Sequence, residues 1–495
     1  MPRSRQPPRS CARRAPMASA WAIISDPEER VMGETEGAGE VDLLITAGCI
    51  VTVDAERRII HDGAIAVRGG DIVAVGPRDA ILRGHRAGRT IDAPDGLVTP
   101  GLIDAHNHPV DYLIKGLCDD TPQMVRLRDR VIPYEDGLTE EEAYASSLGT
   151  FVEMIRLGTT CFVDAAGPRP SAIARAALDL GLRGIVTRKM ADVPGPFGGV
   201  TEDSERAMNL AEETVERFHG AGGGLLRAGY DIDLPPVVSD RAAAFVRDRA
   251  AARDTTIVSH LIGRRAPPGE PEAARNADVE RLERLGLLGP RMILAHIGWL
   301  PEGDVELLAR SGTNIAHCPA ASLVGGNGWA VHGVIADLAA AGANVVLGTD
   351  AAAISRFMDM VRIMQLTAGI HKESRRDPLI MNPHRVFEMA TISAARAIGW
   401  QDRIGSIEAG KAADLVIFDT GNPHWWPEPF GNPVPDLVYG GSGRDARTVL
   451  VNGHVVMEDG VIAGADLRDI GGMVRRAAAS CRARLGMAPS GRWPD

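Results

Sequence analysis

The chain has 495 residues, of which 45% are hydrophobic and 24% charged, and its formal net charge is −11. This length suits one barrel-sized domain with a smaller accessory domain, and the negative charge excludes a general attraction to nucleic acid or anionic lipid. The six cysteines include no CxxC pair, which excludes a disulfide framework and predicts a reducing, cytoplasmic setting. No apolar run is long enough to span a membrane. Together with the negative charge, this predicts neither nucleic acid nor membrane as a partner, and we expect a small-molecule substrate.

Residues 1–40 differ in composition from the rest of the chain. Residues 1–16 are rich in arginine and proline, and the segment that ends at Glu40 is acidic. The apolar run Ala18–Ser25 is too short and too interrupted for the hydrophobic region of a signal peptide. We therefore predict a disordered N-terminal tail over residues 1–40. The alternative is a start codon placed too far upstream, with Met17 or Met32 as the true start, so that residues 1–31 need not belong to the native protein.

Short β-type runs separated by glycine turns occur at both ends of the remaining chain. They lie at residues 42–54, 63–76 and 90–98, and again at 413–419 and 447–464. Runs of this length with turn dipeptides between them are typical of antiparallel strands. Because the two ends of a domain often lie close together, we predict that residues 41–98 and 405–465 pair into one composite β-sandwich. Residues 466–495 are predicted to form a C-terminal helical tail.

Strand-like and helix-like segments alternate over residues 99–404. The strand-like runs lie at 101–108, 158–165, 183–192, 225–233, 255–263, 292–299, 312–319 and 344–352, and clear helical segments lie at 140–157, 241–253 and 277–286. About eight alternations without a fixed repeat predict an α/β fold with a (β/α)8 TIM barrel. The catalytic residues of such a barrel lie at the C-terminal ends of its strands.

Four histidines and an aspartate stand where these strand-like runs end. His106 and His108 are two residues apart and therefore point to the same side of a strand, whereas His260, His296 and Asp350 each follow a short run of β-favouring residues. Packing alone does not explain five such residues at strand ends. Imidazoles and one carboxylate suit a divalent, zinc-like ion that keeps an open position for water. Such an ion lowers the pKa of its water to about 7, which supplies a hydroxide nucleophile at neutral pH.

Several longer segments, taken together, resemble the amidohydrolase superfamily. They are GLVTPGLIDAHNHP, RVIPYEDGLTEEEAYASSLGTFVEMIRLGTTCFVDA, LAHIGWLPEGDVELLARSGTNIAHCP, ANVVLGTDAA and MATISAARAIGWQDRIGSIEAGKAADLVIFD. The resemblance runs from about Val41 to about Gly460. It is closest to the metal-dependent branch that holds S-adenosylhomocysteine/methylthioadenosine deaminases, guanine deaminase and s-triazine (atrazine-type) hydrolases. It implies a TIM barrel beside a composite β-sandwich.

The resemblance also implies a role for each of the five residues. His106, His108, His260 and Asp350 match metal ligands, and His296 matches the histidine that polarises the water or the substrate. Asp350 also matches the carboxylate that takes a proton from the water and delivers it to the leaving group. His296 and Asp350 are therefore the expected catalytic residues. Zinc is the expected ion, with iron, manganese and cobalt as alternatives, and one ion is favoured over two. The family habit implies a homodimer or a higher homo-oligomer.

Three places depart from the pattern of the resembled branch. Its deaminases carry a glutamate three residues after the fifth-strand histidine, where it protonates the substrate ring, but this chain has Gly263. The usual His-Asn-Pro-x-Ser-Asn motif is here His-Cys-Pro-Ala-Ala-Ser at residues 317–322, and the usual asparagine pair is replaced near Ser355 and Arg356. Because glycine cannot transfer a proton, these changes argue against purine nucleosides. Lys189, His317 and Arg356 are the candidate substrate contacts.

Lys189 has no counterpart in this pattern and allows three interpretations. It ends the strand-like run 183–189. Elsewhere in the superfamily a carboxylated lysine at the end of the fourth strand bridges two metals, and His260 and His296 would then hold a second ion. Alternatively, Lys189 points outward or pairs with Asp192. In the third interpretation it supplies the acid that is missing at Gly263.

The remaining histidines give weaker signals. His317 ends a strand-like run, so we expect it either at the border of the pocket or as a hydrogen-bonded packing residue. His332, His371 and His384 lie in helical or loop segments, and we expect them at the surface.

These features predict a metal-dependent hydrolase that attacks an sp2 carbon of a small molecule and cleaves a non-peptide C–N bond. Without an acid at residue 263, we expect an amide, urea, carbamate or substituted heterocycle as the substrate. The alternative is an aminohydrolase (deaminase) or s-triazine-type hydrolase that acts on a nucleobase-like ring. A catalytically silent scaffold is a further alternative. It predicts lost metal ligands, whereas all five positions are intact.

Overall fold

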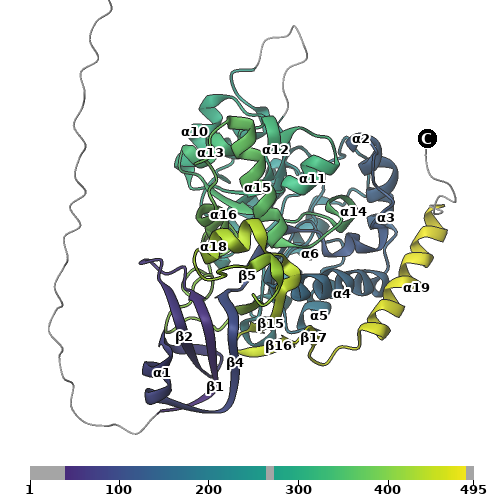
Figure 1. Cartoon of the computed structure of the whole chain (residues 1–495). Helices are drawn as coiled ribbons and strands as arrows, with labels where there is room; N and C mark the ends of the chain where they lie inside the picture. The colour runs from purple at the N-terminus through teal and green to yellow at the C-terminus, as the bar shows by residue number, and fades with distance from the viewer. Residues whose placement is uncertain (1–38, 264–272, 487–495) are drawn as a thin grey trace, which may run out of the picture. The chain divides into compact units, whose positions relative to one another are not determined.

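The computed structural model describes residues 39–263 and 273–486 (Figure 1). Most of the predicted N-terminal tail, residues 1–38, and the last part of the predicted C-terminal tail, residues 487–495, lie outside the described residues. Among the described helices, none combines the length and the apolar composition that a membrane crossing requires.

The barrel strands follow one another in the order that the sequence predicts. They are β5 (Leu102–Asn107), β6 (Thr159–Asp164), β7 (Arg183–Val186), β8 (Leu226–Ala228) with β9 (Tyr230–Asp231), β10 (Ile257–Leu261), β11 (Met292–His296), β12 (Asn314–His317) and β13 (Asn344–Leu347). Neighbours pair in parallel within two sheets, β5-β6-β7-β8 and β9-β10-β11-β12-β13. The parallel order places every strand's C-terminal end on one side of the barrel.

The two sheets are joined through the fourth barrel strand. β8 and β9 form this strand, which is interrupted at Gly229. The Gly229 N–H donates to the carbonyl of Val186 over 2.9 Å, and the Tyr230 N–H donates to the carbonyl of Thr256 over 3.0 Å. One strand thus pairs with β7 on one side and, a residue later, with β10 on the other.

The barrel closes between β13 and β5. The Asp350 N–H donates to the carbonyl of His106 over 2.9 Å, and the side-chain amide of Asn107 donates to the carbonyl of Asp350 over 2.9 Å. Gly348 lies so close to β5 that a Cβ there would stand 2.8 Å from the Cβ and from the carbonyl oxygen of His106. A residue without a side chain allows this approach, which brings Asp350 beside His106.

We expect Gly348→Ala to destabilise the protein by about 1–3 kcal/mol, because the added methyl group overpacks the junction of β13 and β5. Gly369→Ala is the matched control, since an added Cβ in that exposed position of α15 (Met360–Arg375) meets nothing within 4 Å. The control is expected to stabilise by up to about 1 kcal/mol. Urea unfolding measures both effects. A Gly348→Ala midpoint equal to that of the parent would contradict the close approach.

The barrel interior is filled by small and branched residues. One hydrophobic cluster draws on almost every barrel strand and includes Ile103, Cys161, Ile185, Val258, Ile293, Ala316 and Val346. Because these strands surround the cluster, it forms the core inside the barrel. Residues of α17 (Ile392–Ala397) belong to the same cluster, and the Ile103 N–H donates to the carbonyl of Ala390 over 2.9 Å. This contact lies at the start of β5, opposite the strand ends that carry the histidines.

Helices follow the barrel strands in the chain, and the predicted helical segments 140–157, 241–253 and 277–286 are confirmed. The longer helices are α4 (Glu140–Arg156), α5 (Pro170–Asp179), α6 (Ser204–Phe218), α8 (Asp240–Arg253), α9 (Ala277–Arg284), α10 (Glu302–Ser311), α15 (Met360–Arg375) and α16 (Pro383–Met389). Shorter helices include η1 (Pro109–Ile114), α2 (Gln123–Arg126), η2 (Leu127–Val131), α3 (Ile132–Asp136), α11 (Pro319–Val324), α12 (Trp329–His332), α13 (Ile335–Ala340) and α14 (Ala352–Ser355). Thr139 begins α4 with a capping box, in which the Glu142 N–H donates to its hydroxyl over 3.2 Å.

The two β-rich ends of the chain share one eight-stranded sheet, which confirms that they pair. Its order is β17-β16-β15-β14-β4-β1-β2-β3. The strands are β1 (Gly39–Val51), β2 (Ile59–Arg68), β3 (Asp71–Pro77), β4 (His85–Pro100), β14 (Leu415–Asp419), β15 (Ala446–Val451), β16 (His454–Glu458) and β17 (Val461–Ile462). The helix α19 (Leu467–Leu485) follows them. The proposed domain boundaries at residues 98 and 405 stay a prediction.

One pairing in this sheet differs from the antiparallel expectation. β1 and β4 run parallel, with Ile45 opposite Ile91. A parallel neighbour needs a crossover connection, and here β2, β3 and the helix α1 (Arg78–Gly84) lie between the two strands in the chain. The other junction, between β4 and β14, is antiparallel and joins the N-terminal and C-terminal pieces.

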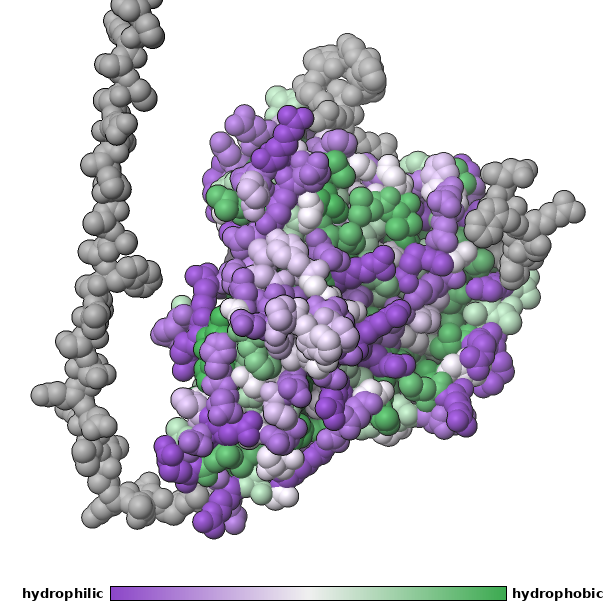
Figure 2. All heavy atoms as spheres, viewed as in Figure 1, coloured by the Kyte–Doolittle hydropathy of each residue, from purple (hydrophilic) through white to green (hydrophobic). Residues whose placement is uncertain are grey.

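Polar residues cover most of the face drawn in Figure 2. A group of hydrophobic residues gathers where Figure 1 places α11 and α12. Leu323 and Val324 of α11 are exposed hydrophobic residues. Ala321 and Trp329 of the same two helices line the cavity described below, so this patch lies on elements that border the site.

Candidate metal centre

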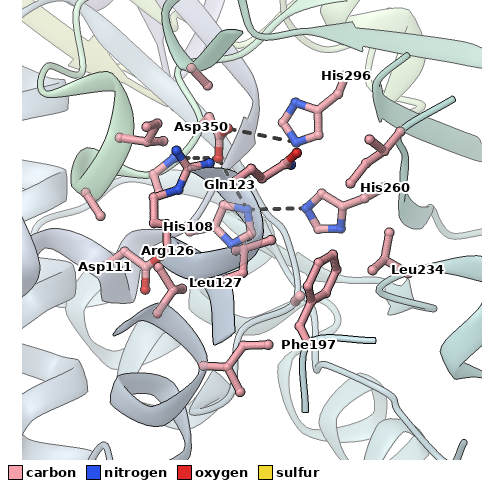
Figure 3. Close-up of a pocket in the computed structure, with 18 of the residues that line it drawn as sticks. His108, Asp111, Gln123, Arg126, Leu127, Phe197, Leu234, His260, His296 and Asp350 are labelled. Atoms are coloured by element: carbon pink, nitrogen blue, oxygen red, sulfur yellow. Dashed lines mark hydrogen bonds and ion pairs between the residues drawn. The ribbon is translucent and has the colours of Figure 1, made fainter. Parts of the chain in front are cut away.

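All five predicted side chains meet at the C-terminal ends of barrel strands. His106 lies in β5 and His108 directly follows that strand, His260 and His296 lie in β10 and β11, and Asp350 follows β13. The donor atoms of His106, His260 and His296 lie within 4.8 Å of one another, and so do those of His106, His108 and Asp350. Figure 3 shows His108, His260, His296 and Asp350 pointing toward a common centre.

The distances between these donor atoms match the spacing of ligands around one ion. His108 Nε2 is 3.4 Å from His260 Nε2 and 3.5 Å from Asp350 Oδ1. His106 Nε2 is 3.9 Å from Asp350 Oδ1, and His296 Nε2 is 3.9 Å from Asp350 Oδ2. Two ligands of a tetrahedral zinc ion, each about 2.0–2.1 Å from the metal, lie about 3.3 Å apart. Only small side-chain movements separate the observed spacing from that value.

Several buried nitrogen atoms of this cluster have no hydrogen-bond partner among the described residues. They are both ring nitrogens of His106 and Nδ1 of His296. Buried polar groups in proteins are nearly always paired. A metal ion at the centre of the cluster would supply the missing partner of His106, so the residues present fit the ion that their types suggest.

Asp233, which follows β9, orients the ring of His260. His260 Nδ1 is 2.9 Å from the carbonyl oxygen of Asp233 and 3.5 Å from its carboxylate oxygen Oδ1. An Nδ1–H that donates to Asp233 leaves Nε2 available for a metal, which is the usual arrangement for a histidine ligand.

His296 and Asp350 both adopt a backbone conformation that is costly for residues other than glycine. Their φ angles are 76° and 63°. Residues in such conformations cost about 1–3 kcal/mol each and cluster at functional sites, where the surrounding structure holds them. Both strained residues lie at or shortly after a strand end, where the strained backbone turns their side chains toward the centre of the cluster.

Burial keeps three of the imidazoles neutral. It lowers the pKa of His108 to about 4 and that of His296 to about 3, and it lowers the pKa of His106 well below the usual range. Burial also disfavours the charged form of His260, but the hydrogen bond and charge of Asp233 outweigh it and raise the pKa of His260 to about 9. Because a metal binds the neutral imidazole, the first three rings are ready for an ion, and His260 would release a proton on binding one.

Four of the five residues line a cavity of about 130 Å³, which Figure 3 shows. Its apolar wall includes Leu127, Val131, Phe197, Leu234, Ile262 and Trp329. Charged and amide side chains form the rest of the wall. A cavity of this kind suits a small molecule with an apolar body and a few polar groups.

Lys189 lies on the wall of this cavity, three residues after β7, which is the third barrel strand. Its Nζ is 3.0 Å from a carboxylate oxygen of Glu135 and 3.8 Å from one of Asp233. Burial disfavours the charged form, but these carboxylates outweigh it and raise the pKa of Lys189 above its usual value. An ammonium group has no free electron pair for carboxylation, so this environment argues against a carboxylated bridge, which stays a prediction.

The suggested pairing of Lys189 with Asp192 is wrong. The Asp192 carboxylate instead accepts hydrogen bonds from the hydroxyls of Ser204 and Ser239, each over about 2.5–2.6 Å. The two side chains therefore face different neighbours. The interpretation of Lys189 as an inward-pointing group is the one that matches the structure.

Gly263 has no room for a side chain. A Cβ at this position would lie 2.0 Å from the carbonyl oxygen of Trp299, in the loop after β11. The place of the glutamate in the resembled deaminases is therefore closed here by backbone atoms, which explains the glycine in structural terms.

Two of the three candidate substrate contacts lie off the described cavity wall. His317 Nε2 is 3.3 Å from Nε2 of His371, and both residues are buried. His317 is thus packed against His371, and its role as a substrate contact stays a prediction. The expectation that His371 lies at the surface is wrong, because the buried face of α15 carries it. Arg356 has a side chain 42% exposed and pairs with Asp119 over 3.4 Å.

Besides Asp233, three charged residues of the cavity wall are absent from the sequence prediction, namely Asp111, Arg126 and Glu135. Asp111 follows His108 by three residues, and Glu135 lies in the segment RVIPYEDG that carries part of the resemblance. These two positions in the sequence could have indicated that Asp111 and Glu135 belong to the site. Arg126 gave none, because it stands beside two further arginines in the segment RLRDR, and the sequence does not show which of them turns inward.

The chain is similar to a known protein family over most of its length. The model of the amidohydrolase family matches residues 97–456. The 5-methylthioadenosine/S-adenosylhomocysteine deaminase of Syntrophobacter fumaroxidans is 35% identical over 425 residues, which cover 86% of this chain and 94% of that protein. The 5′-deoxyadenosine deaminase of Methanosarcina barkeri is 30% identical over 420 residues, which cover 84% of this chain and 93% of that protein.

Solved structures share the fold. An adenosine deaminase from Xanthomonas campestris with bound zinc has a TM-score of 0.81 and 27% identity, and the match covers 90% of this chain and 100% of that one. An atrazine chlorohydrolase from Arthrobacter aurescens, complexed with zinc, has a TM-score of 0.76 and 23% identity and covers 88% of this chain and 100% of that one. The second likeness concerns the fold alone. Together they confirm the predicted barrel with its accessory β-structure.

Proposed function

The chain belongs to the amidohydrolase family, and on this premise we propose that it hydrolyses a C–N bond at an sp2 carbon of a small nitrogen heterocycle with the help of one zinc ion. It is an enzyme that acts on non-peptide C–N bonds. The proposed ligands are His106, His108, His260 and Asp350. The proposal rests on the cluster itself. Both ring nitrogens of His106 are buried without a hydrogen-bond partner among the described residues, and His106 lies close to four other potential ligands.

The proposed chemistry assigns a separate task to each catalytic residue. When bound, a zinc ion lowers the pKa of water and polarises the group under attack. Asp350 takes the proton of the attacking water on its carboxylate and passes it to the leaving nitrogen. The neutral ring of His296, with Nε2 3.9 Å from Asp350 Oδ2, orients the water or the attacked group. The apolar cavity wall excludes other water from the reaction.

Metal analysis tests the proposed site. Purified protein is expected to hold about one zinc ion per chain, and Lys189→Ala is expected to leave that content unchanged, because Lys189 contacts carboxylates and no proposed ligand atom. His260→Ala is expected to lose most of the zinc. Elemental analysis of the three proteins, with melting temperatures as a folding control, measures this. Two ions per chain that fall to one or none in Lys189→Ala would instead establish the bridging lysine.

A second candidate, deamination of an adenine nucleoside, is favoured by the names of relatives at 30–35% identity. The closed space at Gly263 argues against it. Release of ammonia from 5′-methylthioadenosine by the zinc-loaded protein would establish this candidate. Ammonia or amine release from substituted pyrimidines, pterins or triazines, but not from the nucleoside, is the result expected here. No release from any of these rings would contradict the proposed heterocycle.

Two further predictions concern the setting of the enzyme. All five cysteines in the described residues are unpaired and buried, which supports the predicted reducing, cytoplasmic setting. The predicted homodimer or higher homo-oligomer stays a prediction, and light scattering of the purified protein measures it.

A further inference from the structure

We propose that Arg126 binds a negatively charged oxygen of the substrate, such as a carboxylate or an ionised ring oxygen, and thereby makes the enzyme selective for anionic heterocycles. The inference rests on the proposed function, because it names the substrate class of the same site. It concerns a residue that neither the sequence pattern nor the five-residue cluster includes.

Arg126 is a buried cation that lines the catalytic cavity. It ends the short helix α2, only 7% of the residue is exposed, and it shares the cavity wall with His296 and Asp350. Figure 3 shows its side chain among the residues of this cavity. Nη1 of the guanidinium is buried and has no hydrogen-bond partner, and the described residues include no salt bridge to Arg126. No carboxylate among the described residues forms a salt bridge with this side chain, and the charge of Asp350 acts on it without such a bridge.

Such an arrangement is unfavourable unless a ligand completes it. A buried charge without a salt bridge loses its hydration without full compensation, and burial indeed lowers the pKa of Arg126. Arg183, the comparable buried arginine elsewhere in this chain, is bound by both carboxylate oxygens of Asp414, over 2.6 and 3.0 Å. Arg126 lacks an equivalent carboxylate. An anionic group of the substrate supplies one.

The surroundings of Arg126 leave space for the guanidinium and offer further donors. A Cβ at Gly325 would stand 3.3 Å from Nη1 of Arg126 and 2.9 Å from Nδ2 of Asn327, so the glycine makes room on that side. Gln123 of the same helix and Asn327 also line the cavity. Two amides and a guanidinium form a set of donors that matches the several acceptor positions of a carboxylate or a ring oxygen.

Two carboxyl groups lie on another part of the cavity wall. Asp111 and Glu135 are buried on its wall, and Oδ1 of Asp111 is a buried acceptor without a partner. Lys189 pairs with Glu135, and its charge is thus already matched within the protein. Among the described residues of this wall, Arg126 is therefore the cation that is available to a substrate anion, while Asp111 faces a donor such as a ring N–H or an amino group. The substrate that fits both is an amino-substituted heterocycle with an anionic oxygen.

Matched ligand pairs test the proposal without requiring turnover. The probes are nicotinate against nicotinamide and orotate against uracil, where the members of each pair differ by one carboxylate. Calorimetric titration of the zinc-loaded protein is expected to show the anionic member bound about ten- to a hundredfold more tightly, as for a hydrogen bond to a charged group. Arg126→Met is expected to remove this preference and Arg126→Lys to keep part of it.

Arg128→Met is the matched control, since Arg128 lies two residues away but is exposed and paired with Asp129. It is expected to leave the preference unchanged. The melting temperature of Arg126→Met is expected to equal or exceed that of the parent, because an unpaired buried charge is replaced by an apolar side chain. If that variant does not fold, Arg126→Gln replaces it.

Three results would overturn the proposal. They are equal affinity of the wild type for both members of each pair, no detectable binding of either anion, and a preference that persists in Arg126→Met, which would show that the metal alone binds the anion. Zinc content and ammonia release, measured on the same samples, report separately on the proposed function. A protein that binds the anions through Arg126 but hydrolyses no heterocycle would retain the inference on binding and refute the proposed reaction.

Discussion

Asp350→Asn is expected to lower kcat by about a thousandfold, the effect of losing a general acid–base group in the transition state. Asparagine keeps the size of the side chain and an oxygen that can accept the 2.7 Å hydrogen bond from the Ala351 N–H, but it cannot take a proton from water. Asparagine also tolerates the left-handed backbone of residue 350, where φ is 63°. The variant should therefore fold normally, and the loss should appear in the rate of ammonia or amine release.

The control for this experiment is Asp129→Asn. Asp129 is an exposed aspartate that pairs with Arg128 and lies off the cavity wall, so its substitution should leave kcat within about twofold of the parent, as expected for a surface change. Zinc content measured on each protein separates a lost proton carrier from a lost ligand. An Asp350→Asn variant with full zinc content and an unchanged rate would remove Asp350 from the proposed mechanism.

Gly263→Glu, which restores the acid of the resembled deaminases, is expected to destabilise the protein by about 3 kcal/mol or more. The reason is the carbonyl oxygen of Trp299, which would lie 2.0 Å from the new Cβ. Relief requires a movement of the backbone after β10 or after β11, and both strands carry a histidine of the cluster. We therefore expect lower zinc content as well, and no gain of adenine nucleoside deamination.

Gly303→Glu is the matched control for this substitution. Gly303 is an exposed position in the first turn of α10, where an added Cβ meets nothing within 4 Å. A glutamate there replaces a poor helix former and lies favourably at a helix N-terminus, so the variant should be at least as stable as the parent. Urea unfolding and zinc analysis compare the two. A stable Gly263→Glu protein that deaminates 5′-methylthioadenosine would show that the site tolerates the acid after all.

The barrel and the meeting of the five side chains could be predicted because both follow from local patterns. A strand is recognised by its own residues, and parallel strands in a barrel end on the same side, so His106, His260 and His296 had to meet wherever the remaining loops ran. Asp350 was predicted for the same reason. The pairing of the two β-rich ends was predicted because the two ends of a domain often lie close together. The parallel pairing of β1 with β4 was not predicted, because strand order depends on the connection and not on the strand.

Of the three candidate substrate contacts, the structure places only Lys189 on the described cavity wall. His317 and Arg356 end or follow strand-like runs just as the five cluster residues do. The structure turns His317 toward His371 on α15 and Arg356 toward Asp119. In both cases the deciding partner belongs to another segment of the chain, and nothing near either residue in the sequence indicates it.

The sequence by itself determined the fold class and the residues able to hold a metal, because both depend on periodicity and on residue type at strand ends. The family followed from the resemblance of longer segments. Only the tertiary structure decided what surrounds that cluster. Lys189 meets Glu135, Gly263 meets Trp299, and Arg126 lines the cavity with an Nη1 that is unpaired among the described residues. Such contacts join residues that are tens of positions apart, and their energy depends on distances of a few tenths of an ångström between packed side chains. Residue type and spacing along the chain do not contain that information.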